Sequence, residues 1–143
     1  MSHHAGVDVV KTGPNHKITR DARGVVRLRV WRNADLSYEE GADLAVEVRR
    51  CLEEQAAERS VRGLLVDLRD APTVAGPRTR EEIGAFFTAF VAHGHRVAVL
   101  VRDDAVMKMQ LERLIADHCP REGRTFSSES LAVQFASTTA DPD

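Results

Sequence analysis

The fold is decided by the stretch at residues 62–80, RGLLVDLRDAPTVAGPRTR. Its nearly continuous apolar run at residues 64–68 predicts a strand that is covered on both faces, as strands inside a parallel sheet are. One glycine and two prolines then exclude a regular helix across residues 69–77 and predict a loop. A helix follows, beginning either at Pro77 or in a capping box that Thr79 opens. Because α/β folds usually meet their ligands at the carboxyl ends of central strands, we expect any functional site in this loop.

The residues before this stretch predict a hairpin and a helix. Residues 16–21 are typical of a short strand, and residues 25–32 alternate apolar and polar side chains, which predicts a half-exposed antiparallel strand. The sequence SYEE at residues 37–40 fits a capping box. Apolar residues then recur at helical spacing until about residue 59. We therefore expect a β-hairpin followed by an amphipathic helix.

The residues after the stretch predict an alternation of helices and strands. The second helix carries three of the chain's five phenylalanines on one apolar stripe and ends at Gly94. The later elements expected are a strand at residues 96–102, a helix at residues 104–119, a strand at residues 124–127 and a helix at residues 128–137.

The resulting element order, β-β-α-β-α-β-α-β-α, belongs to the α/β class. Strand–helix–strand units predict parallel neighbours, so we expect a mixed, mostly parallel sheet of about five strands packed with about four helices. The pattern predicts one domain over residues 16–137. An irregular N-terminal arm is expected at residues 1–15 and a frayed tail at residues 138–143.

Composition narrows the class of protein. A chain of 143 residues with 43% hydrophobic residues suits one folded domain with a single core. The formal net charge of -2 argues against a nucleic-acid partner, because non-specific affinity for nucleic acid requires an excess of Lys and Arg. No apolar run is long enough for a membrane span, and the N-terminus lacks the pattern of a signal peptide. The two cysteines have no metal-like spacing, so we expect reduced thiols and a cytoplasmic location.

Three segments and the element order carry a resemblance to a known family. The segments are LLVDLRDAP at residues 64–72, RVAVLV at residues 96–101 and TFSSESLAVQF at residues 125–135. Over residues 17–137 the chain resembles the STAS domain, the fold of bacterial anti-sigma-factor antagonists, and more closely the STAS-like (SpoIIAA-like) proteins without an obvious catalytic apparatus. The resemblance implies a non-enzymatic regulatory or protein-interaction module of bacterial type.

The resemblance also implies a position for a phosphorylation switch. Antagonists of this type place a phosphorylatable serine in a D-S-S-G sequence after a strand that ends in D-L. Matching that strand end to residues 67–68 puts the sequence AGPR, residues 75–78, in the place of D-S-S-G. No serine or threonine stands at the acceptor positions, so we expect no phosphoserine switch of the family type. Thr73 and Thr79 flank the gap, and modification of either one stays open.

The predicted site is a contact surface in the loop and at the start of the second helix. At the strand end, Asp67 and Asp70 flank Arg69 and either recognise a charged group of a partner or bind the backbone of their own turn. Both interpretations stay open. The residues expected to bind a partner or ligand are Asp67, Arg69, Asp70, Thr73, Gly76, Arg78, Thr79 and Phe86.

Other chemistry-bearing residues favour structural roles. His93 and His95 have a spacing that metal ligands can have, but a metal site needs three or four convergent ligands, and we expect none. Cys51 falls on the apolar side of a helix and is expected to be inert. Cys119 is expected to be more exposed, next to a helix end, with no assignable base.

A basic face on the second strand suggests an interaction surface. Arg27, Arg29 and Trp31 alternate with apolar residues and are expected on one face, with Arg32 beside them. Such a face can bind an anion, but more often it is a solvated or dimer-forming surface. We expect self-association as a homodimer through it.

Two functional hypotheses follow. The first is a protein-interaction or regulatory module that acts through residues 69–80 and the second helix, with no enzymatic activity and no cofactor. The alternative is a carrier of a small apolar ligand or lipid, because Ile83, Phe86, Phe87 and Phe90 exceed what one buried helix face needs. An enzyme would require Asp67 or Asp70 to converge with a histidine, and no catalytic sequence motif is present.

Overall fold

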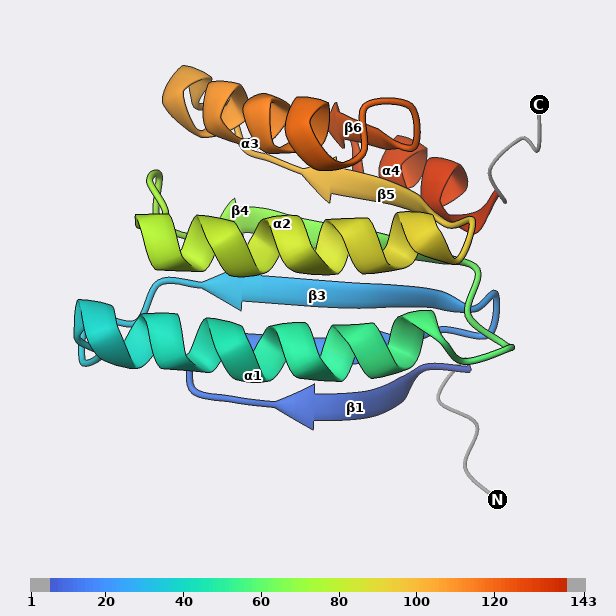
Figure 1. Cartoon of the computed structure of the whole chain (residues 1–143), viewed down its shortest axis with the longest axis horizontal. Helices are drawn as coiled ribbons and strands as arrows, with labels where there is room; N and C mark the ends of the chain where they lie inside the picture. Colours follow the sequence, from blue (N-terminus) through green and yellow to red (C-terminus); the bar gives the residue numbers. More distant parts are fainter. Residues whose placement is uncertain (1–5, 139–143) are drawn as a thin grey trace.

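The computed structural model describes residues 6–138 as a single mixed sheet with helices on both of its faces (Figure 1). The six strands stand in sequence order, β1-β2-β3-β4-β5-β6. Their bounds are β1 (Asp8–Thr12), β2 (His16–Arg20), β3 (Val25–Trp31), β4 (Gly63–Asp70), β5 (Arg96–Leu100) and β6 (Gly123–Phe126). The helices are α1 (Tyr38–Ala56), α2 (Pro77–Ala92), α3 (Ala105–His118) and α4 (Glu129–Ser137).

The sheet is antiparallel at one end and parallel over the rest. β1 pairs with β2 and β2 with β3 antiparallel, whereas β3, β4, β5 and β6 run parallel to one another. A helix connects each parallel strand to the next, as strand–helix–strand units require. The expected α/β class with a mixed, mostly parallel sheet is confirmed.

The sheet has six strands because residues 8–12 form β1, where an irregular arm was expected. The expectation was wrong there because apolar and polar residues do not alternate strictly along β1. Its pairing with β2 shifts register between Val9 and Lys11, and its outer residues are exposed. Val10 nevertheless packs against the core. Residues 1–5 of the expected arm and residues 139–143 of the expected tail lie outside the described residues.

Local capping signals account for the helix starts. Ser37 and Glu40 form the expected capping box at α1. Of the two expected starts of α2, the one at Pro77 is correct, with Gly76 as the N-cap. Asp104 and Ser128 cap α3 and α4 through bonds to backbone N–H groups. The helices therefore begin where side chains satisfy the free N–H groups or where a proline needs none.

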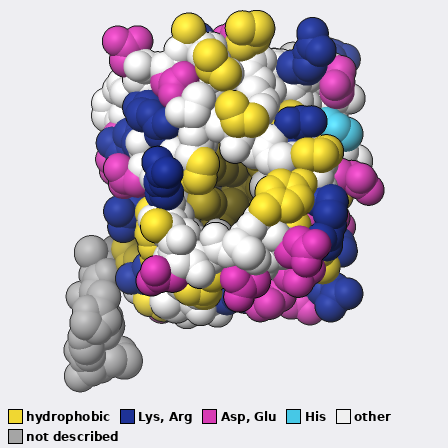
Figure 2. Space-filling model, turned by 90° about the vertical axis from the view of Figure 1, so that its left-hand side faces the viewer, with side chains coloured by type: hydrophobic (Ala, Val, Ile, Leu, Met, Phe, Trp, Pro, Cys, Tyr) yellow, Lys and Arg dark blue, Asp and Glu magenta, His cyan; other side chains and the backbone are white. Residues whose placement is uncertain are grey.

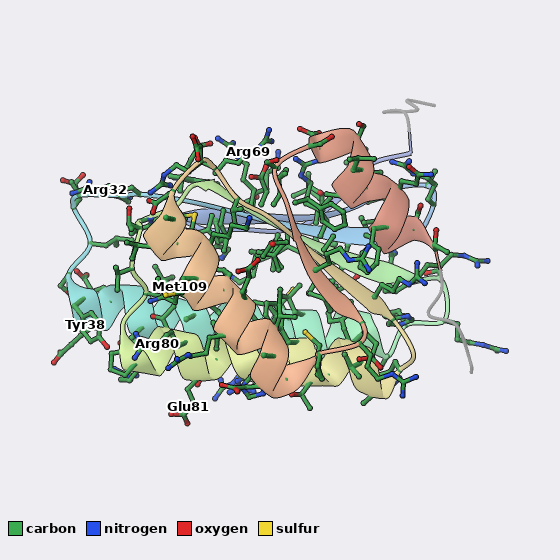
Figure 3. All side chains as sticks on the ribbon, turned by 90° about the horizontal axis from the view of Figure 1, so that it is seen from above. Arg32, Tyr38, Arg69, Arg80, Glu81 and Met109 are labelled. Carbon is green, nitrogen blue, oxygen red and sulfur yellow. The ribbon has the colours of Figure 1, made fainter. Side chains whose placement is uncertain are left out.

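Two apolar layers cover the sheet. The larger layer joins the sheet to α1, α2 and α3 and contains Phe86, Phe87 and Phe90. The smaller layer lies on the other face, where Leu65 and its neighbours pack against α4. Figure 3 shows α4 on the opposite side of the sheet from α1 and α2. β4 is buried on both faces over residues 63–68, as its apolar run predicted.

Candidate functional site

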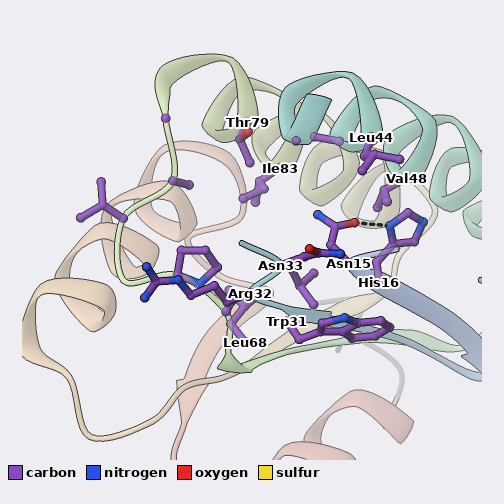
Figure 4. A pocket seen from close by; sticks show the side chains of 18 of the residues that line it. Asn15, His16, Trp31, Arg32, Asn33, Leu44, Val48, Leu68, Thr79 and Ile83 are labelled. Carbon is purple, nitrogen blue, oxygen red and sulfur yellow. Dashed lines mark hydrogen bonds between the residues drawn. The ribbon is translucent and has the colours of Figure 1, made fainter. Parts of the chain in front are cut away.

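A pocket of about 670 Å³ lies between α1, α2 and the sheet, at the carboxyl ends of β3 and β4 (Figure 4). Apolar side chains of helices and strands make most of its wall, among them Leu28, Val30, Leu44, Val48, Val66, Leu68, Ile83 and Phe86. Figure 2 shows this end of the molecule hollowed, with hydrophobic side chains around and inside the hollow. The pocket therefore lies at the edge where α/β folds usually meet ligands.

Small residues on α1 leave the space open. Tyr38, Gly41, Ala45 and Val48 line the pocket at intervals of three or four residues, so they share one face of α1. A Cβ added at Gly41 would meet no atom within 4 Å. The hollow thus results from a glycine and an alanine where a buried helix face usually carries larger side chains.

At the inner wall of the pocket, hydrogen bonds connect His16 to Lys11 and Asn15. The Lys11 ammonium group lies 2.9 Å from His16 Nε2, and Asn15 Oδ1 lies 2.7 Å from His16 Nδ1. Since an ammonium group can only donate, Nε2 accepts and Nδ1–H donates to Asn15. Burial, followed by the charge of Lys11, lowers the pKa of His16 to about 4, although Glu47 opposes the shift. His16 is therefore neutral near pH 7, and both of its ring nitrogens are engaged.

The mouth of the pocket is made by two loops. After β3, the Trp31 Nε1–H and the Asn33 amide both donate to the carbonyl oxygen of Pro14. After β4, the loop at residues 71–76 is held by Arg102, which donates to Ala71 O at 2.6 Å. Both loops are thus fixed by hydrogen bonds to other parts of the chain.

Four of the predicted site residues line this pocket. These are Thr73, Gly76, Thr79 and Phe86. The Thr73 hydroxyl lies 2.8 Å from both the Asp104 carboxylate and the Arg102 guanidinium, so it is engaged in holding the loop. Gly76 and Thr79 belong to the start of α2, and Phe86 is buried at the inner wall.

The other four predicted residues lie away from the pocket. Asp67 is buried and accepts hydrogen bonds from Arg27 at 2.9 Å and from Arg69 at 2.9 and 3.0 Å. Both arginines also reach Glu129 of α4. Burial would raise the pKa of Asp67, but the hydrogen bonds from Arg69 and Arg27 outweigh it and lower that pKa to about 2. This network ties β3 and β4 to α4.

The remaining two predicted site residues, Asp70 and Arg78, form ion pairs on the surface. Asp70 pairs with Arg29 at 3.1 Å, and Arg78 of α2 pairs with Asp43 of α1 at 3.2 Å. All four side chains are more than half exposed. The predicted site residues therefore fall into two separate groups, one at the pocket and one outside it.

The side chains expected to form a basic face on β3 lie partly in the ion pairs and partly at the pocket. Arg27 and Arg29 are paired with carboxylates, and the Arg29 guanidinium also lies 5.3 Å from the centre of the Trp31 ring. The pairing of β3 with β4 shifts register between Arg29 and Trp31, and beyond this irregularity Trp31 lines the pocket. The contact between the Arg29 guanidinium and the Trp31 ring agrees with the expectation that these two residues share a face of β3.

The histidines and the cysteine considered as functional candidates make contacts of a structural kind. The rings of His93 and His95 stack with centres 6.3 Å apart, and His95 Nε2 bonds to the carbonyl oxygen of Ala56. Within residues 6–138 no group of three or more His, Cys, Asp and Glu residues is arranged to hold a metal ion. Cys119 is buried, not exposed as expected, because the chain after α3 folds back and packs Gly123 against its sulfur. Burial raises the pKa of Cys119 to about 12.

Comparisons of the chain with protein-family models, with curated proteins and with solved structures find no match. Among the described residues, no helix has the length and apolar character that crossing a membrane requires. The fold and the site thus define an α/β protein with a mixed sheet and a mostly apolar pocket at the carboxyl edge of that sheet.

Proposed function

We propose that this chain is a non-enzymatic, STAS-like module that binds a small apolar molecule in the pocket. The observation that carries the proposal is the pocket itself, because sites for small molecules are mostly apolar clefts of about 300–1,000 Å³ with a few polar groups. A volume of about 670 Å³ falls inside that range. The position at the carboxyl ends of β3 and β4 supports the same conclusion.

The polar groups of the pocket favour binding over catalysis. Within residues 6–138, no Asp, Glu, Lys or Cys side chain lines the pocket. Its one histidine, His16, is neutral near pH 7 and already uses both ring nitrogens. General acid–base catalysis needs a group that can take up or release a proton within reach of the substrate. The mostly apolar walls suit a carrier or a ligand-sensing module.

Native mass spectrometry tests the proposal with variants at Gly41. Gly41→Phe places a ring in the open space on the pocket face of α1, and Gly41→Ala is the matched control with a single added methyl group. After incubation with a set of short-chain amphiphiles, we expect a bound molecule on the wild type and on Gly41→Ala but not on Gly41→Phe. Apo masses for all three proteins would refute the proposal.

Exposed apolar side chains near the mouth favour a second candidate function, a protein-interaction module. Tyr38 is 54% exposed, Val74 56%, Val106 52% and Met109 65%. Tyr38 and Met109 lie at the same end of the molecule (Figure 3). Clustered exposed apolar residues are typical of interaction sites, and the loop that carries Val74 is already fixed by Arg102. The cytoplasmic location and the regulatory role of bacterial type expected from the sequence belong to this second proposal. It places the homodimer contact on this apolar surface, whereas the sequence favoured the basic face of β3.

Substitutions of the exposed residues test the second candidate. Val106→Asp with Met109→Asp removes apolar surface without changing a residue that lines the pocket, and Leu131→Asp on α4 is a control because Leu131 is also 55% exposed. Analytical ultracentrifugation then compares the oligomeric states. A dimer of the wild type that is lost only in the double variant supports the candidate. Dissociation that is equal in the control contradicts it.

A further inference from the structure

One residue of the pocket, Arg32, has no role in binding a purely apolar molecule. It follows β3 directly and lies at the edge of the pocket (Figure 4). Among the residues that the structure describes, Arg32 is the only charged side chain that lines the pocket. Its backbone is fixed, because its N–H donates to the carbonyl oxygen of Asp70 at 3.0 Å. The pocket therefore has one positive charge at its mouth and no negative charge in its wall.

Arg32 also differs from the arginines around it. Arg29, Arg78 and Arg102 each pair with an aspartate at 3.1 or 3.2 Å. In the part of the chain that the structure describes, the Arg32 side chain has no hydrogen bond or ion pair. Its five N–H donors remain available to a molecule that enters the pocket.

We propose that the ligand is an anionic amphiphile, an alkyl chain with a carboxylate head, whose carboxylate binds Arg32 while the chain lies along the apolar wall. The inference rests on the proposed function and names the ligand class of that same site. A guanidinium group matches a carboxylate with two parallel hydrogen bonds, which are among the stronger ones in proteins. An acidic amphiphile also meets no like charge, because the wall contains no carboxylate.

A carboxylate fits the site better than a phosphate does. One arginine balances the single charge of a carboxylate, whereas a phosphate monoester carries close to two charges near pH 7. Two helix starts line the pocket. At α2, Pro77 lacks an N–H and the Gly76 N-cap offers no side chain, and at α1 the Ser37 hydroxyl already accepts from the Glu40 N–H in a first turn that carries two glutamates. The site thus lacks the cluster of donors that phosphate sites have at helix starts.

Calorimetric titration with three probes of equal chain length tests the inference. The probes are decanoate, decanol and decyltrimethylammonium, which share a ten-carbon chain and carry a negative, a neutral and a positive head group. For the wild type we expect decanoate to bind about tenfold more tightly than decanol, because a charge-assisted hydrogen bond contributes at least that much, and the cationic probe to bind most weakly. High salt reduces the preference for decanoate, because the Arg32 side chain is exposed to solvent.

Arg32→Gln separates the head-group contact from binding itself. We expect this variant to bind decanoate and decanol with equal affinity, while Arg50→Gln, on the exposed side of α1 and outside the pocket, keeps the tenfold preference. An unchanged preference in Arg32→Gln, or equal affinities in the wild type, overturns the carboxylate inference and leaves the proposed function standing. If no probe binds the wild type, the proposed function fails as well.

Discussion

Tyr38, the first residue of α1, lies against Gly76, the N-cap of α2. A Cβ added at Gly76 would stand 2.6 Å from Cζ of the Tyr38 ring and closer still to its Cε1 and hydroxyl oxygen. Both residues line the pocket, so this contact joins the starts of the two helices at its mouth. The Tyr38 ring, and not the backbone, favours glycine here, because φ at Gly76 is -70°.

The substitution Gly76→Ala tests this contact. The added methyl group displaces the Tyr38 ring, which is half exposed and free to turn into solvent. We therefore expect the free energy of unfolding to change by less than about 1 kcal/mol. Tyr38 is the only tyrosine of the chain, so its ring resonances in NMR spectra report the displacement directly.

Gly94→Ala is the matched comparison for that experiment. A Cβ at Gly94 would meet no atom within 4 Å, but φ there is +78°, a conformation that other residues adopt at a cost of about 1–2 kcal/mol. Gly94→Ala should lower the free energy of unfolding by about that amount and leave the Tyr38 resonances in place. Larger destabilisation by Gly76→Ala than by Gly94→Ala would show that the contact is rigid.

Replacement of Gly41 by alanine should stabilise the protein. Gly41 lies inside α1, where glycine costs about 1 kcal/mol relative to alanine, and the added methyl group meets no neighbouring atom. Chemical denaturation should give a free energy of unfolding higher by about 0.5–1 kcal/mol. A lower value for Gly41→Ala than for the wild type would mean that the space beside α1 is not open.

Asp67 should make the stability of the fold depend on acidic pH. Its pKa is about 2 in the folded protein against an ordinary value of 3.8, so its contribution is complete above pH 3.8 and is lost as the pH falls towards 2. A shift of this size corresponds to about 2 kcal/mol. Denaturation between pH 5 and pH 2 should show this loss in the wild type and not in Asp67→Asn.

Asp70→Asn provides the control for the acid experiment. Asp70 also pairs with an arginine at a strand end, but its side chain is 61% exposed, and exposed ion pairs contribute little. We expect the acid dependence of Asp70→Asn to equal that of the wild type. If Asp67→Asn and Asp70→Asn behave alike, the network with Arg27 and Arg69 does not have the role assigned to it.

His16 should contribute a second pH dependence at higher pH. Its pKa is about 4 in the folded protein, against an ordinary value of 6.5 for histidine, so the unfolded chain binds a proton first as the pH falls. The free energy of unfolding is therefore greatest above pH 6.5 and falls by up to about 3 kcal/mol between pH 6.5 and pH 4. His16→Gln should reduce that slope and leave the part that comes from His95, whose pKa is also lowered by burial. An unchanged slope would refute the assignment.

Much of the fold was predictable because its signals are local. The alternation of β3, the apolar run of β4 and the caps at Ser37, Asp104 and Ser128 are contained in short segments. β1 escaped prediction because the register shift after Val9 breaks its alternation.

The pocket was less predictable because it depends on which faces of the helices pack against the sheet. The loop after β4 was expected to carry a site, and four of its eight predicted residues do line the pocket. Asp67 and Arg69 point to the other face of the sheet. The alternation of side chains along β4 puts these two residues on one face, but it does not say which helices cover that face. Gly41 and Ala45 on one face of α1 were a visible signal of a hollow, but their meaning depends on the sheet that lies opposite.

Trp31 allows the most direct measurement of the central claim, that the pocket binds a small apolar molecule. It is the only tryptophan of the chain and it lines the pocket, so its fluorescence reports an occupant without any label. Titration with decanoate should give a saturable change in Trp31 emission for the wild type and Gly41→Ala, and none for Gly41→Phe. The absence of a saturable change in the wild type, or an equal change in Gly41→Phe, would contradict the claim.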